Sequence, residues 1–413
     1  MSYERVGGTL MTNKENNFPK RRFKNFELSG PWEARFLGEL GKINPKGQLP
    51  QTFEYVDLES VVGTEMVSHR KVTRDTAPSR AQRLAQSGDL FYQTVRPYQK
   101  NNFLATNLNG DYVFSTGYAQ LRPIISGYFL LSLVQNDSFV KSVLSRCTGT
   151  SYPSISADEL SKIQVLVSND EQELYAIGKL FQKLDRLIIL HQHKLDKLKN
   201  LKKAYLSEMF PAEGKRVPKR RFPGFEGEWE RQKWMDTVNI STEMVDPSSG
   251  EFDNMLHIAP GNIESFTGRI LDNIKTVKEE HLISGKFRFR AGDIVYGKIN
   301  PQLGKYFFAK IDGLTSADAY VLNGINGTKQ EFLYTILQSK DFFNYSVSVS
   351  KRSGMPKINR EELNDYSYWR PGEDEQNKIG ELFQIIDTLQ SLQQQKLDKL
   401  NDLKKAYLNE LFV

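Results

Sequence analysis

The sequence LFQKLDRLIILHQHKLDKLKNLKKAYLSEMF at Leu180–Phe210 returns at Leu382–Phe412 as LFQIIDTLQSLQQQKLDKLNDLKKAYLNELF. About two thirds of the aligned positions are identical, and the second copy begins 202 residues after the first. Repetition at a fixed interval indicates that one structural unit is used twice. The fold is therefore predicted to contain two copies of one long helix.

Apolar residues recur at alternating steps of four and three along the first copy, and a similar apolar stripe runs along the second. In the first copy they are Leu184, Ile188, Leu195 and Leu198, and in the second Ile386, Leu397, Leu400 and Leu403, with Leu201 and Tyr205 continuing the first approximately. This spacing is typical of a coiled-coil seam, which a polar residue, His191 or Gln393, interrupts near its middle. We expect these residues to pair two spacer helices, with each other or with other chains. Ordinary core packing is the simpler alternative.

The repeat extends beyond the helices. The tract PKRRF, a Gly-Asp pair before an apolar β-prone run, and a Pro-x-Ile segment each occur twice, at Pro19–Phe23 and Pro218–Phe222, Gly88 and Gly292, and Pro153 and Pro356. The runs after Gly-Asp and the segment KYFFAKIDG predict short strands, whereas FLLSLV and FLYTIL predict helices. Between these anchors the two copies diverge, which favours two related domains with different specificities.

This pattern predicts an α+β fold: two mixed α/β domains in tandem, each followed by a long helix, with the two helices pairing as an antiparallel coiled coil. The predicted limits are a flexible extension at 1–17, a first domain at 18–170, a central helix at 171–211, a second domain at 212–372 and a C-terminal helix at 373–413.

Composition narrows the class of protein. With 413 residues, 39% of them hydrophobic and 26% charged, the chain is large and apolar enough for two domain cores, which excludes disorder throughout. Its formal charge of +6 is weak evidence for a polyanionic partner. A single cysteine excludes a disulfide framework, and the longest apolar stretch, at 124–134, is too short to span a membrane. We expect a cytoplasmic protein with no membrane partner and a buried helix at 124–134.

Catalytic motifs are not expected in this chain. The segment GDIVYGKI at Gly292–Ile299 fits G-x-x-x-x-G-K but ends in Ile where magnesium needs a hydroxyl, and its middle is strand-like. An enzyme with a nonstandard nucleotide loop there remains an alternative. Cys147 is expected to be buried rather than nucleophilic, and the histidines show no metal-ligand spacing. We predict no catalytic residue, no metal site and no cofactor in this chain.

Basic and amide side chains gather in loops at matching points of the two domains. These types suit duplex DNA, where Lys and Arg hold phosphates and Arg, Asn or Gln form paired hydrogen bonds to purine edges. Solvated loops are the alternative for any single residue. The candidates are Arg96, Tyr98, Lys100, Asn101, Arg146 and Ser151 in the first domain, and Lys298, Asn300, Gln302, Lys305, Lys351, Arg352 and Ser353 in the second.

The whole pattern resembles the specificity subunit of type I restriction-modification systems: two domains with Gly-Asp strands and Pro-x-Ile segments, each followed by a helix of the form LxxLKKAYLxxxF. The resemblance implies a non-catalytic chain that reads a bipartite double-stranded DNA site, one half-site per target-recognition domain, with the paired helices setting the gap. A helix of roughly 45 Å would span about 13 base pairs.

It also implies partners: two modification subunits that use S-adenosylmethionine to methylate adenine, and restriction subunits that use ATP and Mg to translocate and cut DNA in phage defence. The competing hypothesis is a coiled-coil scaffold whose two globular domains bind proteins.

Overall fold

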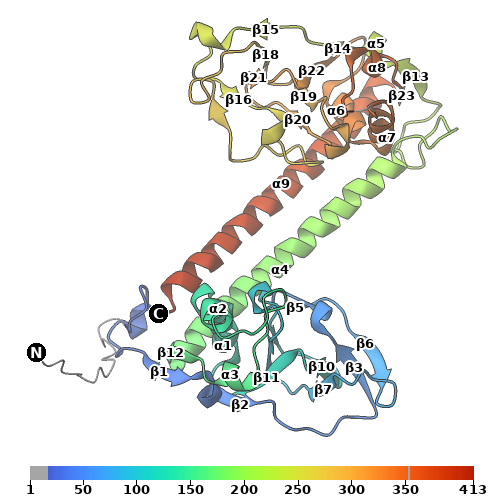
Figure 1. Ribbon diagram of the computed structural model, residues 1–413. Coiled ribbons are helices and arrows are strands. Elements are labelled where there is room, and N and C mark those ends of the chain that lie inside the picture. Colours follow the sequence, from blue (N-terminus) through green and yellow to red (C-terminus); the bar gives the residue numbers. More distant parts are fainter. Residues whose placement is uncertain (1–16, 352–353) are drawn as a thin grey trace, which may run out of the picture. The chain divides into compact units, whose positions relative to one another are not determined.

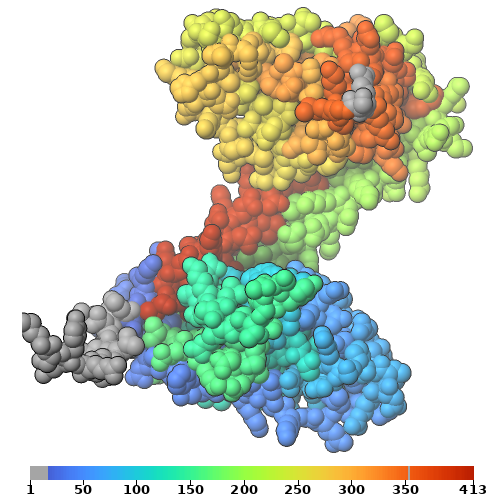
Figure 2. All heavy atoms as spheres, in the orientation of Figure 1, coloured from blue at the N-terminus to red at the C-terminus, as the bar shows by residue number. Residues whose placement is uncertain are grey.

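The computed structural model describes residues 17–351 and 354–413, and within them the chain forms two packed units. Unit 1 comprises the residues up to His191 together with Lys396–Val413, and unit 2 is Gln192–Gln395. Figure 2 shows one face of each unit with all heavy atoms drawn as spheres. Each long helix contributes part of its length to each unit, so unit 1 combines two separate stretches of chain whereas unit 2 is continuous. Most of the predicted extension at 1–17 lies outside the described residues.

Unit 1 consists of small sheets covered by short helices (Figure 1). A four-stranded antiparallel sheet has the order β2-β11-β8-β9, and a second sheet has the order β6-β3-β10-β7, in which only β3 and β10 are parallel. The strands are β1 Glu33–Phe36, β2 Gly41–Ile43, β3 Thr52–Val56, β4 Val61–Val62, β5 Glu65–Met66, β6 Arg70–Thr73, β7 Ala81–Leu84, β8 Leu90–Gln93, β9 Phe103–Leu104, β10 Tyr112–Ser115, β11 Tyr118–Pro123 and β12 Gln164–Val167. The helices are α1 Gly127–Gln135, α2 Asp137–Leu144 and α3 Ala157–Ser161.

Unit 2 repeats the first of these sheets in the order β14-β22-β19-β20 and adds a five-stranded sheet, β15-β18-β21-β16-β17. Its strands are β13 Glu230–Lys233, β14 Val238–Ile240, β15 Met244–Val245, β16 Leu256–His257, β17 Lys275–Thr276, β18 Lys286–Phe289, β19 Ile294–Gly297, β20 Tyr306–Phe308, β21 Gly313–Thr315, β22 Ala319–Gly324 and β23 Ser367–Arg370. Its helices are α5 Trp234–Thr237, α6 Gln330–Gln338, α7 Lys340–Val349 and α8 Arg360–Asn364. The predicted mixed α/β class, the Gly-Asp strands β8 and β19, and the helices α1 and α6 are confirmed.

The repeated sheet forms because its central strands are apolar on both faces. All four residues of β8 and of β19 are buried, and Leu90 and Ile294 at their starts are fully inaccessible. Each central strand lies between β11 or β22 and a short edge strand. Helices α1 and α6 bury Phe129 and Phe332 in the cores of their units. Of the stretch 124–134 predicted as a buried helix, the residues from Gly127 onward lie in the core helix α1, whereas Ile124 precedes the helix and is 69% exposed.

Two long helices, α4 at Glu171–Glu208 and α9 at Glu373–Glu410, are each 38 residues long (Figure 1). Within unit 1, Phe181 contacts Phe412 while Asp185 pairs with Lys404. The later residue of α4 contacts the earlier residue of the C-terminal segment, so the two helices pack antiparallel there. The same direction holds within unit 2. There Lys202 pairs with Asp387, and the adjacent Arg220 and Arg221 pair with Glu208 at the end of α4 and Glu375 at the start of α9.

The seam differs from the predicted apolar stripe in the C-terminal half of each helix. Leu184, Leu195, Ile386 and Leu397 are buried, whereas Leu403 is 40% exposed and Leu201 is 39% exposed. The regular four-three alternation continues from Leu198 to Lys202, which is 7% exposed, and its counterpart Lys404 is half-buried. The prediction that Leu403 lies in the seam is therefore wrong. The neighbouring Lys404 takes the seam position instead, because an aspartate of the other helix neutralises its charge.

These two ion pairs are one interaction used twice. Lys202 and Asp387 in unit 2 are related by the 202-residue repeat to Lys404 and Asp185 in unit 1. Both N–O distances are 2.6 Å. Burial raises the pKa of Asp387, and the charge of Lys202 offsets part of that effect.

The repeated PKRRF tract ties each domain to both long helices. Glu173, 1% exposed at the start of α4, accepts two hydrogen bonds from Arg22, both 2.7 Å long, and one from Trp32. In unit 2, Arg221 makes the same two-bond contact to Glu375 at 2.8 and 2.6 Å. The preceding arginine of each tract pairs with the last glutamate of a helix, Arg21 with Glu410 and Arg220 with Glu208. We call each Arg22–Glu173 or Arg221–Glu375 contact a latch.

Candidate nucleic-acid interface

The Gly-Asp pair makes the turn that starts each central strand. The glycines take left-handed backbone angles, with φ of 91° at Gly88 and 96° at Gly292, which favour a residue without a side chain. The Asp89 carboxylate accepts the backbone N–H of Gln86, and it also binds Arg122 at 2.8 and 2.9 Å. Asp89 is fully buried, so its role is to hold the turn and the adjacent strand.

Each central strand ends in a loop with an unusual backbone. In unit 1, Arg96 has φ 53°, Pro97 starts a single 3-10 turn, and Lys100 has φ 56°. In unit 2, Asn300 has φ 50°, Pro301 starts the same turn, and Gly304 has φ 54°. We call these the reading loops, 96–100 and 300–304. Both prolines are buried. In each loop, the residues that follow the proline include exposed side chains.

The Pro-x-Ile segments hold the reading loops in place. The carbonyl of Pro153 accepts the N–H of Arg96 at 2.7 Å, and the carbonyl of Pro356 accepts that of Asn300 at 2.8 Å. At the neighbouring positions, an isolated β-bridge joins Val95 to Ser154, and another joins Ile299 to Lys357. The Gly-Asp strand and the Pro-x-Ile segment, which recur separately in the sequence, are therefore parts of one structure. The strand end and the short bridge together fix the base of the loop.

The structure brings the first domain's predicted residues to two adjoining loops. Tyr98 is 49% exposed at the tip of the reading loop, and Arg96 lies over the ring of Tyr152 at 4.2 Å in the loop 146–153. Lys100 pairs with Asp137, and this contact lowers the pKa of that carboxyl. The Asn101 side chain accepts the N–H of Gly63. Arg146 is exposed and donates to a carbonyl, and Ser151 is exposed.

The second domain's candidates occupy corresponding places with different engagements. Lys298 lies over the ring of Tyr320 at 5.2 Å, Asn300 accepts a hydrogen bond from Gln302 at 3.2 Å, and Gln302 is exposed. The Lys305 ammonium turns inward and donates to the carbonyl of Ile263. Lys351 is exposed, whereas Arg352 and Ser353 lie outside the described residues.

Sequence reasoning missed Tyr152. It is 64% exposed beside the Pro-x-Ile segment, and within the part of the chain that the structure describes it is the only ring that stacks with Arg96. An exposed tyrosine directly before the recurring proline was the available signal. Asn102, in contrast, is buried and accepts the backbone N–H of Gln93, so it supports the loop from behind.

The alternative nucleotide loop is a strand. Residues 294–297 form β19 in the middle of its sheet, and the N–H of Lys298 donates to the carbonyl of Asp318. A sheet strand has no concave row of free N–H groups for phosphates. Cys147 is half-buried, and burial raises the pKa of its thiol, which opposes nucleophilic behaviour.

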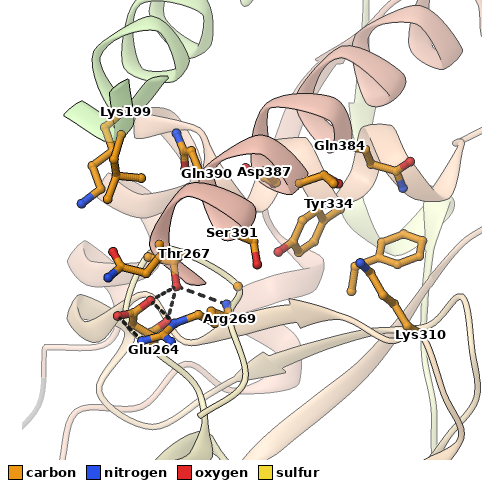
Figure 3. A pocket seen from close by; sticks show the side chains of 15 residues that line it. Lys199, Glu264, Thr267, Arg269, Lys310, Tyr334, Gln384, Asp387, Gln390 and Ser391 are labelled. Carbon is orange, nitrogen blue, oxygen red and sulfur yellow. Dashed lines mark hydrogen bonds and ion pairs between the residues drawn. The ribbon is translucent and has the colours of Figure 1, made fainter. Parts of the chain in front are cut away.

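A cavity of about 340 Å³ in unit 2 lies between α9, α6 and the segment 264–269 (Figure 3). Its Glu264 binds Arg269 at 3.0 and 3.2 Å and accepts the Thr267 hydroxyl at 2.8 Å. The guanidinium lowers the pKa of Glu264, whereas burial raises that of Tyr334. The carboxylate is therefore held as an ion-pair partner and the phenol stays protonated, which leaves this pair without a base poised near neutral pH.

Within residues 17–351 and 354–413, no group of three or more His, Cys, Asp or Glu residues is arranged to hold a metal ion. No helix in the same ranges has the length and apolar character needed to cross a bilayer.

Comparisons with known proteins agree with this geometry. A family model for the type I restriction modification DNA specificity domain matches residues 228–402. The type I restriction enzyme EcoDI specificity subunit of Escherichia coli is 27% identical over 326 residues, 71% of this chain and 71% of that protein.

Two solved structures are also similar. The S subunit of a type I restriction-modification system from M. genitalium covers 96% of this chain and 99% of that chain, with a TM-score of 0.67 and 13% identity, and this likeness shows the fold. The HsdS subunit from Thermoanaerobacter tengcongensis is 21% identical and covers 92% of this chain and 96% of that chain, with a TM-score of 0.38.

Proposed function

Because the chain belongs to the family of type I restriction-modification specificity subunits, we propose that each of its domains reads one half of a bipartite double-stranded DNA site through its reading loop. The chain is a DNA sequence-recognition subunit, and its family implies a non-catalytic role.

One observation carries it: the same loop backbone is built twice with different side chains. Arg96 and Asn300 share a left-handed conformation, a following buried proline and a backbone bond to a Pro-x-Ile segment. A duplicated frame with divergent tips is what two readers of different sequences require, because phosphate contacts position a protein whereas base contacts specify.

The partners are part of the same proposal. Two modification subunits carrying S-adenosylmethionine would methylate adenine, and restriction subunits carrying ATP and Mg would move and cut DNA. Exposed faces of α4 and α9 would dock the modification subunits, since these helices are the most similar parts of the two halves. We place the complex in the cytoplasm, where it would meet phage DNA.

The scaffold alternative is not favoured, because the similar proteins are specificity subunits rather than scaffolds. It would leave the two reading loops without a role.

The proposal is tested by co-expressing the chain with its modification partner and sequencing host DNA for methylated adenine. A single split motif is expected. Exchange of residues 18–170 for the corresponding domain of a relative should change one half of the motif and leave the other half intact. Absence of any split motif, with the complex assembled, would contradict the proposal.

The role of the helices has a separate test. Inserting seven residues at the middle of both α4 and α9 preserves the seam and lengthens each helix by about 10 Å. The gap in the methylated motif should then grow by about three base pairs, since base pairs rise about 3.4 Å each. Inserting seven residues in an exposed loop, for example after Gly214, should leave the gap unchanged.

A further inference from the structure

We propose that Arg96 and Asn300 are the corresponding base-reading positions of the two domains, with Arg96 selecting guanine in one half-site and Asn300 selecting adenine in the other. The inference rests on the proposed function and deepens it. It assigns one base pair in each half-site to one residue, which the family resemblance alone does not do.

The two positions are equivalent in the backbone rather than by alignment alone. Each is the last residue before a buried proline, has φ near 50°, and donates its N–H to the carbonyl of the proline that opens a Pro-x-Ile segment. Each follows a fully buried strand that fixes its distance from the core sheet. A side chain leaving either position therefore starts from the same place on its domain.

The left-handed conformation of Arg96 points to a function. Residues with a side chain avoid φ near 50° because Cβ crowds the backbone, and asparagine tolerates it better than arginine does. Backbone strain of this kind persists where the surroundings impose it, and it clusters at binding sites. Glycine would be the least strained residue here, so an arginine at this position favours a role for the guanidinium.

Arg96 is also prepared for planar recognition. Its guanidinium lies over the Tyr152 ring at 4.2 Å, which restricts the plane of its donors before DNA arrives. Within the described ranges no carboxylate pairs with it, in contrast to Arg22 and Arg122, which bind Glu173 and Asp89. Its Nε is buried without a partner. A guanidinium fork matches O6 and N7 of guanine in the major groove.

Asn300 offers the other standard match. A carboxamide donates to N7 and accepts from N6 of adenine. Its oxygen accepts a hydrogen bond from Gln302 at 3.2 Å, which orients the amide, and an amide oxygen has a second lone pair for the base. Gln302 and Leu303, which follow it in the loop, are exposed, and the second domain places Met355 where the first has Tyr152.

The experiment uses the intact complex with its modification partner. Wild-type protein should methylate a split motif with guanine in one half and adenine in the other. Arg96→Lys keeps the charge but loses the fork, so discrimination at one guanine should fall roughly 5- to 150-fold, with the salt dependence of binding unchanged. Arg96→Asn should shift that position from guanine towards adenine, and Asn300→Arg should do the reverse in the other half.

Arg35→Lys is the matched control, since that arginine lies on β1 and pairs with Glu39, which is not part of a reading loop, and its substitution should leave the motif unchanged. Thermal unfolding midpoints of all variants should agree, which excludes misfolding as the cause. An unaltered motif in both Arg96→Lys and Arg96→Asn would overturn the assignment while leaving the proposed function standing. No split motif from the wild type would remove the proposed function itself.

Discussion

The two domains are built on one frame but differ in how each contact is completed. Both have a latch, a Gly-Asp turn and a reading loop. In unit 1 the latch glutamate also accepts a bond from Trp32, and Asp89 binds an arginine. In unit 2, Asp293 binds the amide of Asn323, and the Trp229 N–H has no partner within the described residues. The backbone geometry is common to the two, while the charges that stabilise it have diverged, so equivalent substitutions should have unequal effects.

The latches give the largest expected difference. Glu173→Ala leaves the Arg22 side chain, 6% exposed, as an unpaired buried charge and removes the partner of Trp32. Breaking a buried pair in this way costs about 3–5 kcal/mol of unfolding free energy. Glu375→Ala should cost about 1 kcal/mol less, because no tryptophan N–H depends on it. Denaturant titration followed by tryptophan fluorescence measures both.

Glu33→Ala, an exposed substitution on β1, is the control and should change the unfolding free energy by less than about 0.5 kcal/mol. Equal losses for Glu173→Ala and Glu375→Ala would mean that Trp32 adds nothing to the first latch.

The two interhelix ion pairs give the next effect. Lys202 and Asp387 have side chains 9% and 18% exposed, while Lys404 and Asp185 are 22% and 18% exposed. Lys202→Met leaves Asp387 buried and unpaired and should cost about 2–4 kcal/mol, and Lys404→Met should cost less because water reaches that pair more easily. Calorimetry of a single variant of each of the four residues, and of one double variant for each pair, gives the interaction energy of each ion pair. A larger loss for Lys404→Met would reverse the expected order.

A pH effect follows from Asp387. Its folded pKa is raised above the unfolded value near 4, so between these two values the folded chain holds a proton that the unfolded chain has released. Stability from this group is therefore greatest below the unfolded pKa and falls as pH rises through the folded pKa, by about 1.4 kcal/mol for each unit of difference. Stability curves of wild type and Asp387→Asn should diverge in that window, whereas the exposed Asp402→Asn should track the wild type.

The ring beside Arg96 gives the smallest difference. Tyr152→Ala removes the surface that orients the guanidinium, a contact worth about 0.5–1 kcal/mol at an exposed site. Affinity for the cognate duplex should fall by about two- to fivefold, through the half-site of the first domain. Met355→Ala, at the corresponding place in the second domain, should change affinity less. The affinity of Tyr152→Ala should also be titrated with duplexes that carry single base-pair changes. If Tyr152→Ala weakens binding equally to all of these duplexes, the ring does not act through Arg96.

Much of the frame was predictable because it is repeated or periodic. The long helices, α1, α6 and the Gly-Asp strands follow from local spacing, which a single sequence contains. The prediction of the seam was wrong at Leu403. A lysine lies in the seam only if an aspartate neutralises its charge, and the aspartate that does so, Asp185, is more than two hundred residues away in the sequence. Heptad spacing carries no information about that pairing.

The second sheet of each unit, β6-β3-β10-β7 in unit 1 and β15-β18-β21-β16-β17 in unit 2, was not predictable. These sheets have four strands in unit 1 and five in unit 2, several only two residues long, and they pair segments without shared sequence. The repeat places the candidate loops at matching points of the two domains. It does not predict the hydrogen bond between a reading loop and its Pro-x-Ile segment, because that bond joins residues nearly sixty positions apart. The engagement of Lys305 with a carbonyl likewise depends on side-chain packing.

The left-handed backbone at Arg96 and Asn300 has a consequence for how such loops diversify. Of the residues that read base edges, asparagine and aspartate adopt this conformation at low cost, whereas arginine and glutamine are strained in it. New specificities for adenine or cytosine should then arise by a single substitution at this position. A change to guanine should require a second, stabilising substitution such as an aromatic neighbour. The backbone would thus bias the order in which lineages acquire new target sequences.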